Sequence, residues 1–138
     1  FFFFFLAETL VKRDFFGNDS FLIFCYDKEG SLCSSKFILG FDGVATYISG
    51  GTSPAGLKNK VGYLLMWEAI LFLKEKGFKT FDLEGKNDPR YPKFTSDWGG
   101  FSHFKEKYGG VPVEFPTSFI KYYHKVLRLA SKIGPLPL

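Results

Sequence analysis

The chain lacks any long hydrophobic run. Its apolar opening, residues 1–6, is far too short to cross a bilayer, which takes about 20 apolar residues in a helix. There is no basic segment followed by a small-residue cleavage site, so we expect no signal peptide. An initiator methionine is also missing, and we therefore expect the sequence to begin inside a longer protein.

Cysteine is scarce as well. The two cysteines, Cys25 and Cys33, fall on the arms of an expected hairpin around residues 28–31. A disulfide needs a matched register and geometry that a sequence does not supply, and we expect two free buried thiols instead. Such thiols fit a reducing compartment, so the predicted location is the cytoplasm.

Several catalytic patterns are absent too. The two histidines, His103 and His124, have no cysteine or carboxylate near them at metal-ligand spacing, so we expect no metal site. No serine occupies a nucleophile elbow, and no glycine loop has the spacing of a nucleotide hydrolase. These absences argue against zinc enzymes, serine hydrolases and nucleotide hydrolases.

The composition that remains is that of one globular domain. The 138 residues are 46% hydrophobic and 20% aromatic, with 19 phenylalanines, which predicts a core built from rings. The net charge of +4 permits a polyanionic partner without requiring one. We treat residues 1–138 as a single domain.

Hydrophobic periodicity predicts alternating strands and helices. Apolar residues alternate in the expected strands and recur at helical spacing in the expected helices, and a glycine at 77 is expected to cap the longest helix. We expect helices at 6–16, 58–76 and 118–133, strands at 21–26, 32–41, 44–49, 79–83 and 111–115, and loops at 50–56 and 87–100. This order predicts an α/β fold with a mixed, mostly antiparallel sheet flanked by helices.

The most informative motif has two parts. Residues 81–85 read Phe-Asp-Leu-Glu-Gly, and residues 98–110 place a Phe-Lys step, Phe104 and Lys105, on a short turn bracketed by glycine pairs. We expect the glycines to leave the amides of that turn open to an anion. The two parts together resemble the second half of Fem-type peptidyltransferases. These tRNA-dependent enzymes add amino acids to the peptide of a peptidoglycan precursor and have the GNAT fold.

The resemblance implies a GNAT-like acyltransferase domain and a function in cell-wall synthesis. The donor would be an aminoacyl-tRNA, the acceptor a lipid-linked or nucleotide-linked muropeptide, and no cofactor is expected. Lys105 would be the catalytic cation that neutralises an oxyanion or a phosphate, and Phe104 would stack on the terminal adenine. The neighbouring His103 is a candidate proton acceptor. Family members pair two such domains, so an upstream GNAT-like half of the same chain is also expected.

Residues 51–62 occupy the position where ordinary GNAT acetyltransferases hold the pyrophosphate of acyl-CoA. Their glycine spacing does not match that signature, and Pro54 removes one amide donor. Fem-type proteins also lack the signature. Lys58 and Lys60 stand at the expected helix start, where cations oppose the helix dipole, so they either meet a phosphate of the donor or face solvent.

Asp82 and Glu84 alternate with apolar residues and are expected on the polar face of one strand. An acid–base role for this pair is conceivable. The alternative, which we favour, is that Asp82 orders the glycine loop by hydrogen bonding. No strong general base is evident elsewhere in the sequence.

A basic stripe is expected on the last helix. Its members are spaced at helical intervals and are Lys121, Lys125, Arg128 and Lys132. The stripe would contact a tRNA backbone, an anionic membrane surface on its cytoplasmic side, or only solvent. Two other functions stay open for the domain: an acyl-CoA-dependent GNAT N-acyltransferase, and a non-catalytic RNA- or membrane-binding module.

Overall fold

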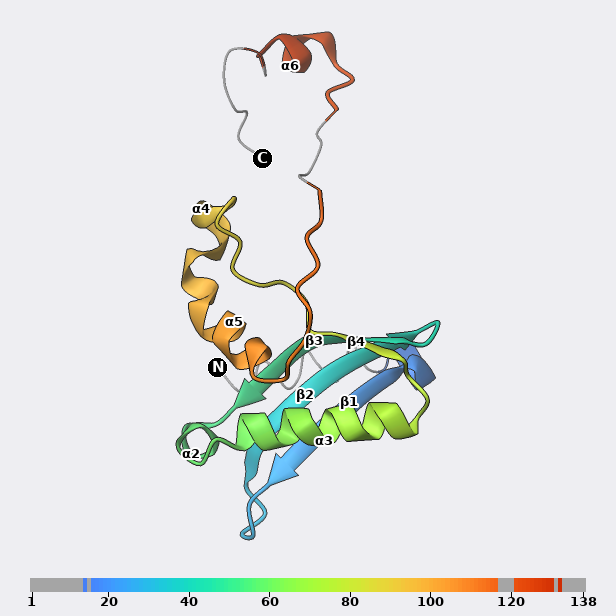
Figure 1. Cartoon of the computed structure of the whole chain (residues 1–138), viewed down its shortest axis with the longest axis vertical. Coiled ribbons are helices and arrows are strands. Elements are labelled where there is room, and N and C mark those ends of the chain that lie inside the picture. Colours follow the sequence, from blue (N-terminus) through green and yellow to red (C-terminus); the bar gives the residue numbers. More distant parts are fainter. Residues whose placement is uncertain (1–13, 15, 117–120, 131, 133–138) are drawn as a thin grey trace.

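A four-stranded sheet is the centre of the fold. The computed structural model describes residues 14, 16–116, 121–130 and 132. The strands are β1 (Ser20–Tyr26), β2 (Leu32–Phe41), β3 (Val44–Thr52) and β4 (Thr80–Asp82), and they lie side by side in that order (Figure 1). A single 3-10 turn, Gly17–Asp19, precedes β1.

The sheet is mixed and mostly antiparallel, as predicted. β1, β2 and β3 form an antiparallel meander, in which Asp42 and Gly43 close the second hairpin with positive φ angles of 47° and 75°. β4 runs parallel to β3 but pairs only with Val44–Thr46. Among the described residues, the C-terminal half of β3 therefore has no ladder neighbour on its β4 side.

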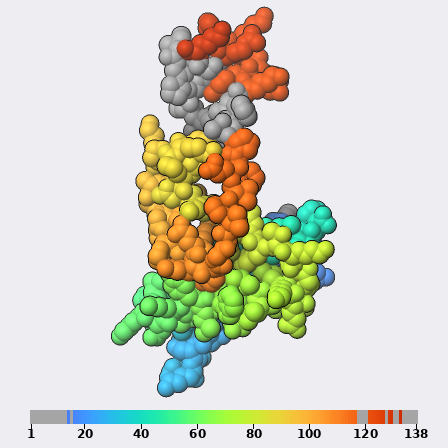
Figure 2. All heavy atoms as spheres, viewed as in Figure 1, coloured from blue at the N-terminus to red at the C-terminus, as the bar shows by residue number. Residues whose placement is uncertain are grey.

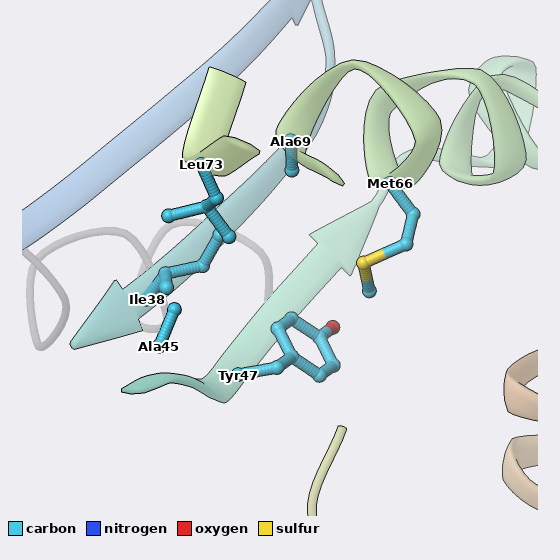
Figure 3. Packing of buried hydrophobic residues seen from close by; sticks show 6 residues of the cluster. All are labelled: Ile38, Ala45, Tyr47, Met66, Ala69 and Leu73. Atoms are coloured by element: carbon cyan, nitrogen blue, oxygen red, sulfur yellow. The ribbon is translucent and has the colours of Figure 1, made fainter. Parts of the chain in front are cut away.

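One long helix covers a face of the sheet. In α3 (Val61–Glu75), the buried residues are spaced at helical intervals, so one stripe faces the strands. The resulting core cluster consists of Ile38, Ala45, Tyr47, Met66, Ala69 and Leu73 (Figure 3). Fully burying a side chain of this size contributes about 1.5 to 3 kcal/mol, so this contact fixes α3 on the sheet. Gly77, with φ 89°, ends the helix as predicted.

The region before α3 differs from the prediction. β3 continues to Thr52, so the expected loop begins later, and a separate short helix α2 (Pro54–Lys58) follows. The single helix predicted over 58–76 is wrong at its start, because Lys60 adopts a left-handed conformation with φ 56°. That residue turns the chain between α2 and α3.

The expected loop at 87–100 is partly helical. It contains α4 (Pro92–Thr95) and a 3-10 turn (Ser96–Trp98), and α5 (Gly99–Glu106) begins at once. The first glycine pair therefore forms the first turn of α5, and does not flank it as expected. Figure 2 shows this segment seated on the part of the surface formed by α2 and α3.

The strand predicted at 111–115 is wrong. The chain leaves α5 through Gly109, with φ 69°, and runs past the loop before α4, where Arg90 Nη1 donates a hydrogen bond to the Phe115 carbonyl oxygen at 3.2 Å. Val111 and Val113 are exposed along this segment. An alternating apolar pattern forms a strand only where a ladder partner lies within reach, and here none does among the described residues.

The terminal helices are only partly testable. The expected helix at 6–16 falls almost wholly outside the described residues. The expected helix at 118–133 is wrong over 121–124, which are not helical, and α6 covers only Lys125–Ala130. Both cysteines are free thiols, as predicted, but only Cys33 is buried and Cys25 is half-buried; burial raises the pKa of the Cys33 thiol. Within the described ranges, no helix is long and apolar enough to span a membrane.

Candidate functional site

The two parts of the sequence motif meet at the end of β4. Asp82 Oδ1 accepts a hydrogen bond from the Glu84 backbone N–H at 2.7 Å, and Glu84 turns the chain with φ 65°. Gly85 then lies against the indole of Trp98, so closely that a Cβ on residue 85 would stand 2.8 Å from Trp98 Cζ3. Only glycine allows the loop to pack on that ring.

Hydrogen bonds fix this loop onto α5. The hydroxyl of Ser102 accepts from the Asn87 backbone N–H at 2.8 Å and donates to the Trp98 carbonyl at 3.0 Å. The hydroxyl of Thr95 accepts from the Asp88 backbone N–H at 3.1 Å, and Thr95 lies close enough to donate to the Asp88 carbonyl. The end of β4 and the helix after it are therefore held as one unit.

Lys105 completes the junction. Its Nζ donates a hydrogen bond to the Gly85 carbonyl oxygen at 2.5 Å. The side chain is partly buried, and burial lowers the pKa of Lys105, while the carboxylates of Glu84 and Asp82 oppose that shift. An ammonium has three donor hydrogens, so the bond to Gly85 leaves two for another acceptor. The site thus presents a fixed cation beside the end of β4.

Phe104 has a different environment from its neighbour. It is half-buried and packs against the core cluster, with its ring centroid 4.9 Å from that of Tyr63 and 5.4 Å from that of Tyr108. The Tyr108 hydroxyl donates to the Tyr63 carbonyl at 3.1 Å. This aromatic group attaches α5 to the start of α3. Stacking of Phe104 on a nucleobase stays a prediction.

A residue that the sequence analysis missed lies beside Phe104. Lys36 on β2 is only 4% exposed, and its Nζ stands 5.5 Å from the centroid of the Tyr47 ring and 5.4 Å from that of Phe104. No carboxylate of the described chain forms an ion pair with it, and burial lowers the pKa of Lys36 to about 8. The sequence did carry a signal for this position. Side chains two apart in a strand point to the same face, so residue 36 shares the face of Ile38.

Gly50 makes room for this lysine. It pairs with Lys36 across β2 and β3. A Cβ at residue 50 would collide with the Tyr47 hydroxyl and would stand 3.0 Å from Lys36 Cδ. The missing side chain therefore provides the space in which the lysine stem and the tyrosine hydroxyl lie.

The remaining predicted site residues are more dispersed. His103 is exposed and lies near the Glu106 carboxylate, whose pKa it helps to lower. Lys58 and Lys60 are exposed beside the α2–α3 junction, and neither has an ion-pair partner in the described part of the chain. The structure does not bring these three into contact with Lys105.

The structure shows a structural role for one member of the carboxylate pair. Asp82 orders the turn through its bond to Glu84, as the favoured alternative predicted. The expectation that both lie on one face of a strand is wrong, because β4 ends at Asp82 and Glu84 has a left-handed backbone. Both carboxylates also favour the charged form of Lys105 through their negative electrostatic potential.

Hydrogen bonds within the protein occupy amides of the segment at residues 51–62. Ser53 Oγ accepts from the Gly56 N–H at 3.1 Å, and the Ser53 carbonyl accepts from the Leu57 N–H at 2.8 Å. Gly56 is buried against the carbonyl of Cys33, so it serves packing. The amides of Gly56 and Leu57 are therefore already bonded within the protein.

The predicted basic stripe is not one helical face. Lys125 and Arg128 lie on α6, while Lys121 and Lys132 lie outside it. The Lys121 ammonium stands 5.0 Å from the centroid of the Tyr123 ring. Among the residues described, no group of three or more histidine, cysteine or carboxylate side chains forms a metal cluster.

An antiparallel meander followed by a strand–helix–strand crossover is the arrangement of an acyltransferase domain of the α/β class. Residues 6–93 match the family model described as an acetyltransferase (GNAT) domain, which covers more than half of the chain. The chain therefore belongs to the GNAT acetyltransferase family. The match spans the sheet and α3 and ends before α5, so it does not include Phe104 and Lys105. No curated protein and no solved structure matches the chain.

Proposed function

We propose that this domain transfers an aminoacyl group from the 3′ end of an aminoacyl-tRNA to an amine of a peptidoglycan precursor peptide. Membership of the GNAT family supports acyl transfer. The donor and acceptor rest on the resemblance of segments 81–85 and 98–110 to Fem-type transferases. The observation that carries the proposal is the hydrogen bond from Lys105 to Gly85, because it joins those two segments into one site.

The chemistry requires little covalent participation by the protein. A neutral amine attacks the ester carbonyl, and the carbonyl oxygen gains negative charge in the tetrahedral intermediate. A preorganised cation beside that oxygen lowers the barrier, since it needs no reorientation during the reaction. Lys105 has this property, because its bond to Gly85 fixes the ammonium before substrate arrives.

The donor preference follows from the segment between β3 and α3. Acyl-CoA carries a pyrophosphate that needs several free amides or cations. Here the amides of Gly56 and Leu57 are bonded to Ser53, and Pro54 has none to offer. This arrangement supports a donor without a pyrophosphate, such as an aminoacyl ester. Lys58 and Lys60 remain candidates for contact with the phosphate backbone of that donor.

An acyl-CoA-dependent N-acyltransferase is the second candidate. The description of the matched family favours it. In that case, the Lys105 cation would face the oxyanion from a thioester, and the pyrophosphate would need cations such as Lys58 and Lys60 in place of backbone amides.

The two donors are separable by direct binding. Calorimetric titration of the full chain with acetyl-CoA is expected to show no saturable binding up to about millimolar concentration, meaning an affinity weaker than about −4 kcal/mol. A mixture of radiolabelled aminoacyl-tRNAs is expected to bind and, with a muropeptide acceptor, to transfer label. Saturable acetyl-CoA binding at about tens of micromolar would replace the first candidate by the second.

The cellular setting belongs to the same proposal. A peptidoglycan precursor would be met in the cytoplasm or at the inner face of the membrane. In Fem-type proteins a first GNAT-like half binds much of the precursor, so we include such an upstream half as a partner of this domain. Transfer by the 138-residue chain without any upstream segment would show that this partner is dispensable.

A further inference from the structure

We propose that Lys36 is the proton acceptor of the acyl transfer, taking the proton that the attacking amine loses as it forms the new C–N bond. The inference rests on the proposed function and deepens it, because no base was evident in the sequence. Two lysine side chains are neighbours of Phe104. Lys105 follows it in α5, and the Lys36 ammonium stands over the face of its ring.

Burial lowers the pKa of both lysines, but their electrostatic environments differ. Lys105 lies near the carboxylates of Glu84 and Asp82, which favour its charged form. In the described part of the chain, no carboxylate pairs with Lys36, and the rings of Tyr47 and Phe104 lie beside its ammonium. Paired titratable groups in contrasting environments are how active sites divide acid and base roles. Lys105 is thus suited to remain a cation and Lys36 to exchange a proton.

Among the described residues, no charged side chain contributes to the lowered pKa of Lys36, whose cause is burial. The titratable side chains of this cluster are those of Tyr47 on β3, Tyr63 on α3 and Tyr108 after α5. Burial raises the pKa of Tyr47 to about 12 and that of Tyr108 to about 12, so both phenols keep their protons at neutral pH. Burial alone lowers the pKa of Lys36 to about 8, within reach of ordinary assay conditions.

The Lys36 nitrogen is not completely sealed, although the residue is only 4% exposed. In the described ranges, the side-chain atoms that are both sealed and without a hydrogen bond are Ser35 Oγ and Ser49 Oγ, and Lys36 Nζ is not one of them. After it accepts a proton, the new ammonium faces the two aromatic rings, and cation–π attraction stabilises it there. A base that is neutral before the step and stabilised after it suits general-base catalysis.

The step balances without any added reagent. The amine nitrogen bonds to the acyl carbon, the oxyanion forms beside Lys105, and the nitrogen's proton passes to Lys36 directly or through one water. When the carbon–oxygen bond to the ribose breaks, the proton passes from Lys36 to the leaving ribose oxygen. Lys36 is then neutral again, and the products are an amide and a free hydroxyl.

Two measurements test the role. The first is an NMR titration of isotope-labelled lysine amines in the full chain, with Lys36→Met used to assign the signal. A transition near pH 8 is expected for Lys36. A transition near the ordinary value of 10.5 would overturn the proposal, whatever the donor proves to be.

The second measurement is the pH profile of transfer from radiolabelled aminoacyl-tRNA to a muropeptide. The wild-type transfer rate should rise up to about pH 8 and then become constant. Lys36→Met should transfer about 10²- to 10⁴-fold more slowly, and its rate should not show this rise with pH. Lys36→Arg should be equally slow, because a guanidinium keeps the charge but does not release a proton. Lys74→Met, which removes an exposed lysine on α3, is the matched control.

The outcomes separate the two proposals. If wild type transfers and Lys36→Met or Lys36→Arg keeps its rate, Lys36 is not the acceptor, and the proposed function stands. If wild type transfers from neither aminoacyl-tRNA nor acetyl-CoA, the proposed function fails, and the catalytic role of Lys36 fails with it.

Discussion

The ammonium of Lys105 donates a hydrogen bond to the carbonyl oxygen of Gly85, a residue twenty positions earlier in the chain. This bond joins the loop after β4 to α5. The loop also packs on the Trp98 indole, where residue 85 has no room for a side chain. The cation therefore has a defined position at the end of β4, and the predictions below begin with it.

Lys105→Ala should slow acyl transfer by about 10²- to 10³-fold, because a fixed cation is lost from the position of the developing oxyanion. The change in the free energy of unfolding should be small, about 1 kcal/mol, since one hydrogen bond of a partly exposed side chain is removed. Steady-state transfer rates and a urea denaturation curve measure the two effects.

Lys105→Arg is the matched control for that variant. It should restore transfer only in part, because a planar guanidinium directs its donors differently from an ammonium. Normal turnover in Lys105→Ala would remove this residue from the catalytic site.

Phe104→Ala should destabilise the domain by about 2 to 4 kcal/mol, because the half-buried ring contacts the core cluster, Tyr63 and Tyr108. The loss should appear as a lower midpoint in urea denaturation. Phe101→Ala on the same helix is the control, since Phe101 is 62% exposed and should change stability by less than about 0.5 kcal/mol. Equal losses in the two variants would mean that Phe104 does not hold α5 to α3.

Stability should depend on pH through Lys36. The folded pKa of about 8 lies below the ordinary value of 10.5, so between these values the unfolded chain binds more protons than the folded one. The free energy of unfolding should therefore rise with pH across that window, by up to about 3 kcal/mol at 1.36 kcal/mol per pKa unit. Below about pH 8 this contribution is constant.

Comparison with Lys36→Met separates the contribution of Lys36 to the pH dependence of stability from that of the tyrosines. The raised pKa values of Tyr47 and Tyr108 oppose it above about pH 10, because unfolded tyrosine ionises there and folded tyrosine does not. The methionine variant should lack the rise and should be more stable than wild type by about 1 to 3 kcal/mol near pH 7, since it buries no unpaired charge. If the free energy of unfolding changed with pH in the same way for wild type and variant, Lys36 would be charged in the folded state across that pH window, and the prediction would be wrong.

The basic residues near the C-terminus should govern salt dependence if they contact RNA. Changing Lys121, Lys125, Arg128 and Lys132 to Gln together should flatten the logarithmic dependence of tRNA affinity on salt by about 0.7 to 0.9 per lost phosphate contact. Filter binding over a range of salt concentrations measures the slope. An unchanged slope would leave these side chains facing only solvent, and lost binding to anionic vesicles would indicate a membrane contact instead.

Much of the fold was predictable because local signals agreed with the tertiary structure. The bounds of β2 were correct, since alternating residues and the Asp42–Gly43 turn both specify a hairpin. The break at Lys60 was not predictable, because a lysine with positive φ has no sequence signature. The segment at 111–115 failed for another reason: its pattern is that of a strand, but pairing depends on which strands lie nearby.

Less of the site could be predicted. From the sequence, segments 81–85 and 98–110 were linked only by resemblance, and the close approach of Gly85 to Trp98 is visible only in the structure. Lys36 was missed because a lysine is exposed by default, although its strand parity with Ile38 indicated the buried face. Its significance depends on Phe104, a residue far away in the sequence.

Gly50 has a consequence for how this domain would respond to random mutation. It carries no reactive group, yet any side chain there would collide with the Tyr47 hydroxyl and crowd the stem of Lys36. Inactivating substitutions should therefore accumulate at this position as readily as at a residue that performs chemistry. A screen that ranks positions by loss of activity would therefore place this glycine, which has no side chain, among the residues that perform chemistry.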